Sequence, residues 1–178
     1  TQFVSNLAVD QLHTIDFDPG AIVTQWVGDS SRSWHGAENW APGTVPNGSF
    51  ASALLSGSST SVTNISLVQQ ATIASLQIAS SNTYRVRGTG SLQMDSTDGM
   101  ASIEVASGDH RIDADLELVD DATINIATGA SLSLGGTTNL QGRTVTKEGA
   151  GTLYLDGTTQ LAGSTLNIVA GAVGGEGE

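Results

Sequence analysis

Acidic side chains are concentrated in one stretch of the chain, "MDSTDGMASIEVASGDHRIDADLELVDD". Nine of the eighteen Asp and Glu residues lie between Asp95 and Asp121. If Asp113 and Asp115 belong to one strand, their carboxylates share a face about 7 Å apart, as the acids of a polysaccharide-cleaving enzyme would. Ca²⁺ prefers several oxygen ligands, and the candidates here are Asp113, Asp115, Asp120 and Asp121. We favour the simpler interpretation of a solvated face, because neither the EF-hand spacing nor a glycine-rich nonapeptide repeat is present.

The remaining candidate side chains do not form a catalytic set. The three His residues are far apart without metal-ligand spacing, and we expect His110, which follows Asp109, to lie on the surface. The sequence has no Cys, no "GxSxG" nucleophile turn and no "GxxxxGK" phosphate loop. Arg85 and Arg87 form an outward basic pair that could meet an acidic partner. We therefore predict no enzyme activity, no catalytic residues and no cofactor, with Ca²⁺ the one ion left open.

The charge balance narrows the range of partners. The chain has 6 Lys and Arg against 18 Asp and Glu, a formal net charge of −12. Such a charge repels nucleic acids and anionic lipid surfaces, so we predict no nucleic-acid partner. No apolar run reaches the roughly 18 to 20 residues that span a bilayer, and we predict no membrane insertion.

An internal repeat organises the second half of the sequence. The phrases "IEVASG", "INIATG", "VTKEGAG" and "LNIVAG" recur, and their first residues are 21 positions apart: Ile103, Ile124, Val145 and Leu166. A glycine closes each phrase: Gly108, Gly129, Gly149 and Gly171. A second alternating segment follows each glycine, and a third, shorter one completes the unit. Alternation of apolar and polar residues predicts half-buried strands, and glycine allows the backbone angles of sharp corners.

These features predict an all-β fold, a three-faced β-solenoid with about 21 residues per turn. Successive turns would stack about 4.8 Å apart, with the four repeat residues above as one inner ladder. Each turn would be stable because its neighbours cover it. An antiparallel sandwich also has short strands and regular turns, but it requires no constant spacing, and we therefore favour the solenoid.

Two stretches resemble a known family. "TVTKEGAGTLYLDG" followed by "TLNIVAGAVGG" is similar to the autotransporter-associated β-strand repeat, and "QWVGDSSRSWHGAENWAPGTVPNG" resembles the Trp-rich block that often precedes it in exported bacterial proteins. The resemblance covers residues 25 to 175. It implies a right-handed parallel β-helix that is secreted or displayed on the cell surface. It also implies a structural or adhesive role without enzyme activity.

We predict three parts of the chain. Residues 1–24 form an N-terminal arm, 25–58 a Trp-rich capping segment and 59–178 the solenoid. Trp26, Trp34 and Trp40 would form a buried cap, or alternatively a platform on which sugars stack. The arm has no Lys or Arg and is rich in apolar residues: Phe3, Val4, Leu7, Val9, Leu12, Ile15 and Phe17. It could lie on its own coil, or add as a strand to a neighbouring subunit.

The leading functional hypothesis is an extracellular structural protein, a β-solenoid subunit that associates head-to-tail into a fibre or surface stalk. A head-to-tail contact that does not close into a ring produces a fibre. The partner would then be a second copy, or the next module of the same chain. The alternative is an adhesin module that binds polysaccharide, and a polysaccharide lyase is the third choice.

Overall fold

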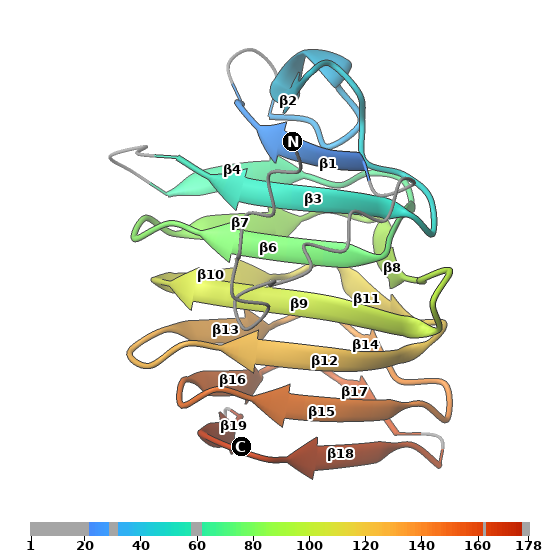
Figure 1. The fold of residues 1–178 in the computed structure, drawn as a ribbon, viewed down its shortest axis with the longest axis vertical. Coiled ribbons are helices and arrows are strands. Elements are labelled where there is room, and N and C mark those ends of the chain that lie inside the picture. Colours follow the sequence, from blue (N-terminus) through green and yellow to red (C-terminus); the bar gives the residue numbers. More distant parts are fainter. Residues whose placement is uncertain (1–21, 29–31, 58–61, 162, 176–178) are drawn as a thin grey trace, which may run out of the picture.

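The computed structural model describes residues 22–28, 32–57, 62–161 and 163–175, and these residues form one stacked coil of short strands (Figure 1). The strands belong to three sheets, and successive strands along each sheet are parallel apart from the β1–β2 pair. The prediction of an all-β solenoid is confirmed, with about five turns. Within the described residues, no helix has the length and hydropathy to span a bilayer.

Each of the five complete turns, from β3 to β17, contributes one strand to each sheet. The first sheet contains β1 (Ile22–Trp26), β2 (Trp40–Ala41), β3 (Ala51–Ser56), β6 (Ser75–Ala79), β9 (Met100–Ser107), β12 (Asp121–Ile126), β15 (Thr144–Glu148) and β18 (Thr165–Ile168). The second contains β4 (Thr63–Ser66), β7 (Tyr84–Arg87), β10 (Asp109–Ile112), β13 (Ser131–Leu134), β16 (Thr152–Leu155) and β19 (Ala172–Gly174). The third contains β5 (Ala71–Ile73), β8 (Ser91–Met94), β11 (Asp115–Leu118), β14 (Thr138–Asn139) and β17 (Thr159–Gln160).

Alternation along the strands places the core inside the coil. In β13, for example, Leu132 and Leu134 are buried while Ser131 and Ser133 are partly exposed. Parallel pairing sets Leu132 beside Leu153 of the next turn. Burial of such stacked side chains stabilises the fold at roughly 25 cal/mol per Å² of apolar surface, so each turn depends on its neighbours.

The register of the first sheet corrects the predicted ladder. Ile103 pairs with Ile124 as predicted, but Ile124 pairs with Lys147, and Val145 pairs with Ala122. The step between β12 and β15 is therefore 23 residues instead of 21. Two residues are added at the corner before β15 and two are lost at the corner after it, so β13 and β16 keep a 21-residue step. Corners tolerate such changes because they lie outside the paired strands.

The start of the coil also lies earlier than predicted. Strand β3 pairs in parallel with β6, and β1 pairs in parallel with β3. Both strands precede the predicted boundary at residue 59, and β1 includes residues assigned to the arm. The remainder of the arm, residues 1–21, lies outside the described residues.

The four repeat glycines share one backbone conformation. Gly108, Gly129, Gly149 and Gly171 all have a positive φ, between 69° and 81°. At Gly149 a Cβ atom would lie 2.2 Å from the carbonyl oxygen of Ile126. Both the left-handed φ and the close approach of the backbone therefore require glycine at this corner.

Candidate functional site

The last described turn leaves three strand edges without a partner among the described residues. Strands β17, β18 and β19 each end their sheet, and we call their outward edges the bare edge (Figure 1). Leu161, Ile168 and Val169 are 54 to 69% exposed there. Behind them a narrow apolar gap of about 30 Å³ is lined by residues of all three sheets, among them Leu155, Leu161 and Leu166. Unpaired edges and exposed apolar side chains favour pairing with another strand.

The opposite end of the coil is covered on all three sheets by residues 32–50, which we call the cap. In the first sheet the two-residue strand β2 pairs antiparallel with β1. In the second sheet, Ser33 bridges Ser66 of β4. In the third, Thr72 of β5 receives a hydrogen bond from Gly48 N–H and donates one to the Asn47 side chain. One end of the described coil is therefore covered by the cap, whereas the other end presents unpaired strand edges.

Three tryptophans form the centre of this cover. Trp26, Trp34 and Trp40 are at most 4% exposed. Trp40 makes edge-to-face contacts with both others, at centroid distances of 5.1 and 4.9 Å, and its indole N–H donates to the Trp34 carbonyl oxygen at 2.6 Å. A platform for sugar stacking needs an exposed ring face, and none of these rings presents one.

The structure separates the predicted calcium ligands. Asp113 follows β10 in the second sheet, whereas Asp115 begins β11 in the third, because the chain turns between them. They are thus not neighbours on one strand as we predicted. The side chains of Asp115, Asp120 and Asp121 each accept a hydrogen bond from a different backbone N–H, of Thr137, Ser96 and Thr144. In the described part of the chain, no group of three or more His, Cys, Asp or Glu residues is placed to hold a metal ion.

Asp113 instead belongs to a chain of ion pairs across the turns. Arg85 and Arg111 both donate to its carboxylate, and Arg111 also contacts Asp156 at 2.8 Å. Burial by itself would raise the pKa of Asp113, but the hydrogen bonds from Arg111 and Arg85 outweigh it and hold the pKa below its usual value. Arg85 therefore has an acidic partner within the coil, whereas Arg87, the other member of the predicted basic pair, is exposed.

A second acidic pair was missed by sequence reasoning. Asp95 and Asp120 are 25 positions apart, yet the stacking of turns brings their carboxyl groups together. Partial burial, the negative charge of Asp120 and a hydrogen bond between the two raise the pKa of Asp95. Only the register of neighbouring turns could have revealed this pair.

His110 is buried, contrary to the surface position that we predicted, with 2% exposure. It occupies an inward position of β10, opposite Leu132 of β13. Its Nδ1 accepts a hydrogen bond from the Tyr84 backbone N–H at 3.1 Å, and its Nε2 lies 2.7 Å from the Ser107 carbonyl oxygen. A neutral ring with the proton on Nε2 satisfies both contacts.

Acid should therefore destabilise the fold through His110. Burial lowers its pKa below the ordinary value of 6.5, so the unfolded chain binds the proton first. The contribution of His110 to the free energy of unfolding is fully present above about pH 6.5. It falls as the pH is lowered, by at most about 1.4 kcal/mol per pH unit, and levels off below the folded-state pKa. Urea unfolding between about pH 8 and pH 5 should show a smaller loss in His110→Gln than in the unmodified protein. Equal losses in both proteins would contradict this assignment.

Lys147 lies in the inner ladder between Ile124 and Ile168, and its side chain is fully buried. Its Nζ donates to the carbonyl oxygens of Glu148, Gly149 and Ala170, at 2.6, 2.8 and 3.2 Å. Burial lowers the pKa of this ammonium group. Since Ala170 belongs to the next turn, Lys147 links two turns at their corner through hydrogen bonds to backbone carbonyl groups.

Comparison of the chain with protein-family models, with curated proteins and with solved structures finds no match. The resemblance to the autotransporter-associated repeat therefore depends on the sequence phrases alone.

Proposed function

We propose that this chain is a non-enzymatic structural protein of the extracellular space, a solenoid subunit of a fibre or surface stalk. The observation that carries the proposal is the contrast between the covered N-terminal end and the bare edge. At the covered end the outermost strand is the two-residue β2, which is too short for the bare edge of another copy to stack on. Association therefore requires a separate strand.

The N-terminal arm is the strand that we propose. Its residues 1–21, which precede β1, contain seven large apolar residues and no Lys or Arg, a composition suited to pairing with the exposed Ile168 and Val169 of a second copy. Strand addition satisfies backbone groups along the free edge and buries alternate side chains. Because the arm precedes β1 at one end and the bare edge lies at the other, each copy could bind the next and extend a fibre.

Two variants should each block the proposed pairing of the arm of one copy with the bare edge of the next. Ile168→Lys places a charge on the bare edge, which disfavours strand addition, and Leu7→Asp with Val9→Asp alters the arm. Electron microscopy and sedimentation velocity should show fibres for the unmodified chain and monomers for each variant. An equimolar mixture of the two variants should form dimers only, since one intact arm and one intact edge remain.

Val23→Lys is the matched control, because Val23 is 53% exposed, close to the exposure of Ile168, but lies at the covered end. It should still form fibres. An unmodified chain that stays monomeric at the highest concentration reached would refute the proposal, as would fibres of the Ile168→Lys variant.

A further inference from the structure

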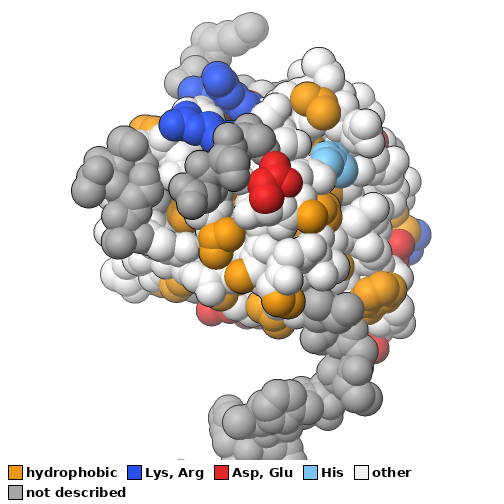
Figure 2. All heavy atoms as spheres, turned by 90° about the horizontal axis from the view of Figure 1, so that it is seen from above, with side chains coloured by type: hydrophobic (Ala, Val, Ile, Leu, Met, Phe, Trp, Pro, Cys, Tyr) orange, Lys and Arg blue, Asp and Glu red, His pale blue; other side chains and the backbone are white. Residues whose placement is uncertain are grey.

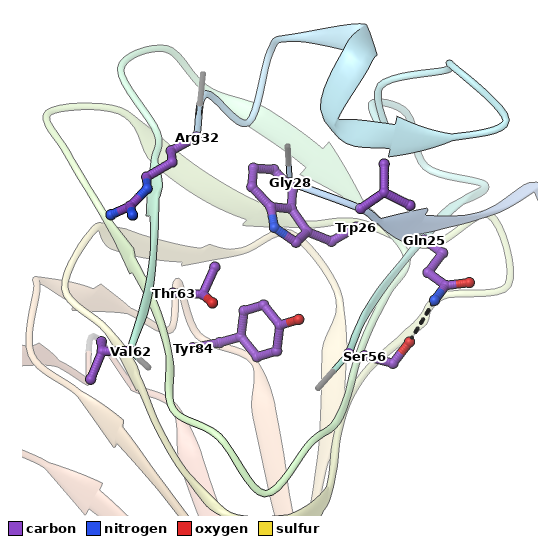
Figure 3. A pocket seen from close by; sticks show the side chains of 10 residues that line it. Gln25, Trp26, Gly28, Arg32, Ser56, Val62, Thr63 and Tyr84 are labelled. Atoms are coloured by element: carbon purple, nitrogen blue, oxygen red, sulfur yellow. Dashed lines mark hydrogen bonds between the residues drawn. The ribbon is translucent and has the colours of Figure 1, made fainter. Parts of the chain in front are cut away.

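A cavity lies between the cap and the first turns of the second sheet (Figure 3). Its volume is about 450 Å³, within the range of roughly 300 to 1,000 Å³ usual for small-molecule sites. The residues that line it include Gln25 and Trp26 of β1, Ser56 of β3, Thr63 of β4, Tyr84 of β7 and Arg32 of the cap. The cavity is distant from the bare edge on which the proposed function depends.

Two polar groups that line this cavity make no hydrogen bond to a described residue. Trp26 and Tyr84 are each 4% exposed, and both line the cavity, as Figure 3 shows. Neither the Trp26 indole N–H nor the Tyr84 hydroxyl makes a hydrogen bond to any residue that the structure describes. Both groups face the cavity and are therefore open to hydrogen bonds with a ligand that carries acceptor atoms.

Two glycines keep these polar atoms uncovered. A Cβ atom at Gly28 would lie 2.1 Å from the Trp26 Nε1, and one at Gly57 would lie 3.2 Å from the Tyr84 hydroxyl oxygen. Both glycines also line the cavity. A side chain at Gly28 would therefore block the indole N–H, whereas glycine leaves it open to a ligand.

The described residues of the lining differ in charge from the chain as a whole. The described lining residues include Arg32 and no Asp or Glu, although the chain has three acids for each base. Figure 2 shows basic side chains gathered at one edge of this end of the coil. The Gln25 amide donates to the Ser56 hydroxyl at 3.0 Å, which holds this side chain at the rim. An exposed guanidinium beside several hydroxyl and N–H groups suits an anionic ligand rich in acceptors.

We infer that this cavity binds a carboxylated sugar unit, a hexuronic acid of a polysaccharide. The Arg32 guanidinium pairs with the carboxylate, while the Trp26 N–H, the Tyr84 hydroxyl and the Thr63 hydroxyl bind ring and hydroxyl oxygens. The protein would then be an adhesive as well as a structural element.

Calorimetric titration with a galacturonic acid trimer tests the inference, with the neutral galactose trimer as the comparison ligand. The acidic trimer should bind and the neutral one should bind at least about tenfold more weakly, since a hydrogen-bonded charge pair contributes about 1.5–3 kcal/mol. Arg32→Gln should lose this preference. Arg143→Gln, which removes an exposed Arg far from the cavity, should retain it.

A glycine pair separates binding from folding. Gly28→Ala and Gly99→Ala both place alanine at a positive φ, of 47° and 72°, but only the first methyl group meets the indole. At Gly99 nothing lies within 4 Å of the added carbon. With far-UV circular dichroism confirming folded protein, Gly28→Ala should abolish binding and Gly99→Ala should not. No binding of the acidic trimer, equal binding of both trimers, or full binding by Arg32→Gln would overturn the inference.

Discussion

Replacing Trp34 with alanine is expected to lower the free energy of unfolding by about 3–5 kcal/mol. The Trp34 side chain is fully buried, so the substitution leaves a cavity beneath the cap. It also removes the contact with the Trp40 ring at 4.9 Å and the hydrogen bond from the indole N–H to the Pro46 carbonyl oxygen at 3.3 Å. For a domain of this length, the midpoint of thermal unfolding should fall by about 10 °C, as measured by far-UV circular dichroism.

The same substitution should also increase aggregation. The backbone of Trp34 bonds to the Ser66 carbonyl oxygen at 2.9 Å and so covers the edge of β4. A loosened cap exposes that edge to other chains. Below the midpoint of thermal unfolding, the variant should therefore scatter more light than the unmodified protein. Phe50→Ala is the control, because Phe50 is the last residue of the cap and is an aromatic residue that is 45% exposed. An equal effect of the two substitutions would contradict the role assigned to Trp34.

Replacing Lys147 with methionine is expected to cost about 2–4 kcal/mol. Methionine keeps most of the apolar stem and therefore fills the inner ladder, but it leaves three carbonyl oxygens without the ammonium group that they share. A buried acceptor that loses its donor costs the full desolvation penalty of the group. Urea unfolding followed by circular dichroism measures the difference.

The comparison variant is Arg143→Met, which removes an exposed cation just before the same strand. Surface changes of this kind usually fall within about 0.5 kcal/mol. If Lys147→Met proves as stable as the unmodified protein, apolar packing alone maintains this corner. The assignment of Lys147 as a link between turns would then be wrong.

The repeat could be recognised from the sequence because it depends on local rules. Alternating apolar residues such as Leu132 and Leu134 define strands with one inward face, and glycines such as Gly129 are the residues that tolerate a positive φ at a corner. The constant spacing of 21 residues then favours a stacked coil over an antiparallel sandwich.

The candidate sites, by contrast, depend on which turn lies beside which. The 23-residue step that sets Lys147 beside Ile124 is produced at corners, where residues can be gained or lost without breaking a pattern. The contact between Asp95 and Asp120, the burial of His110 below Tyr84, and the cavity between Trp26 and Tyr84 all join residues of different turns.

The sequence by itself determined the all-β class, the inward face of most strands and the corner glycines, because each arises from neighbours within one turn. The tertiary structure alone decided the exact register and the partners of the buried polar groups. The physical reason is that the free energy of stacking depends on surfaces from separate turns. The relative position of these turns is set by the packing of the whole coil, and no single repeat of the sequence specifies it.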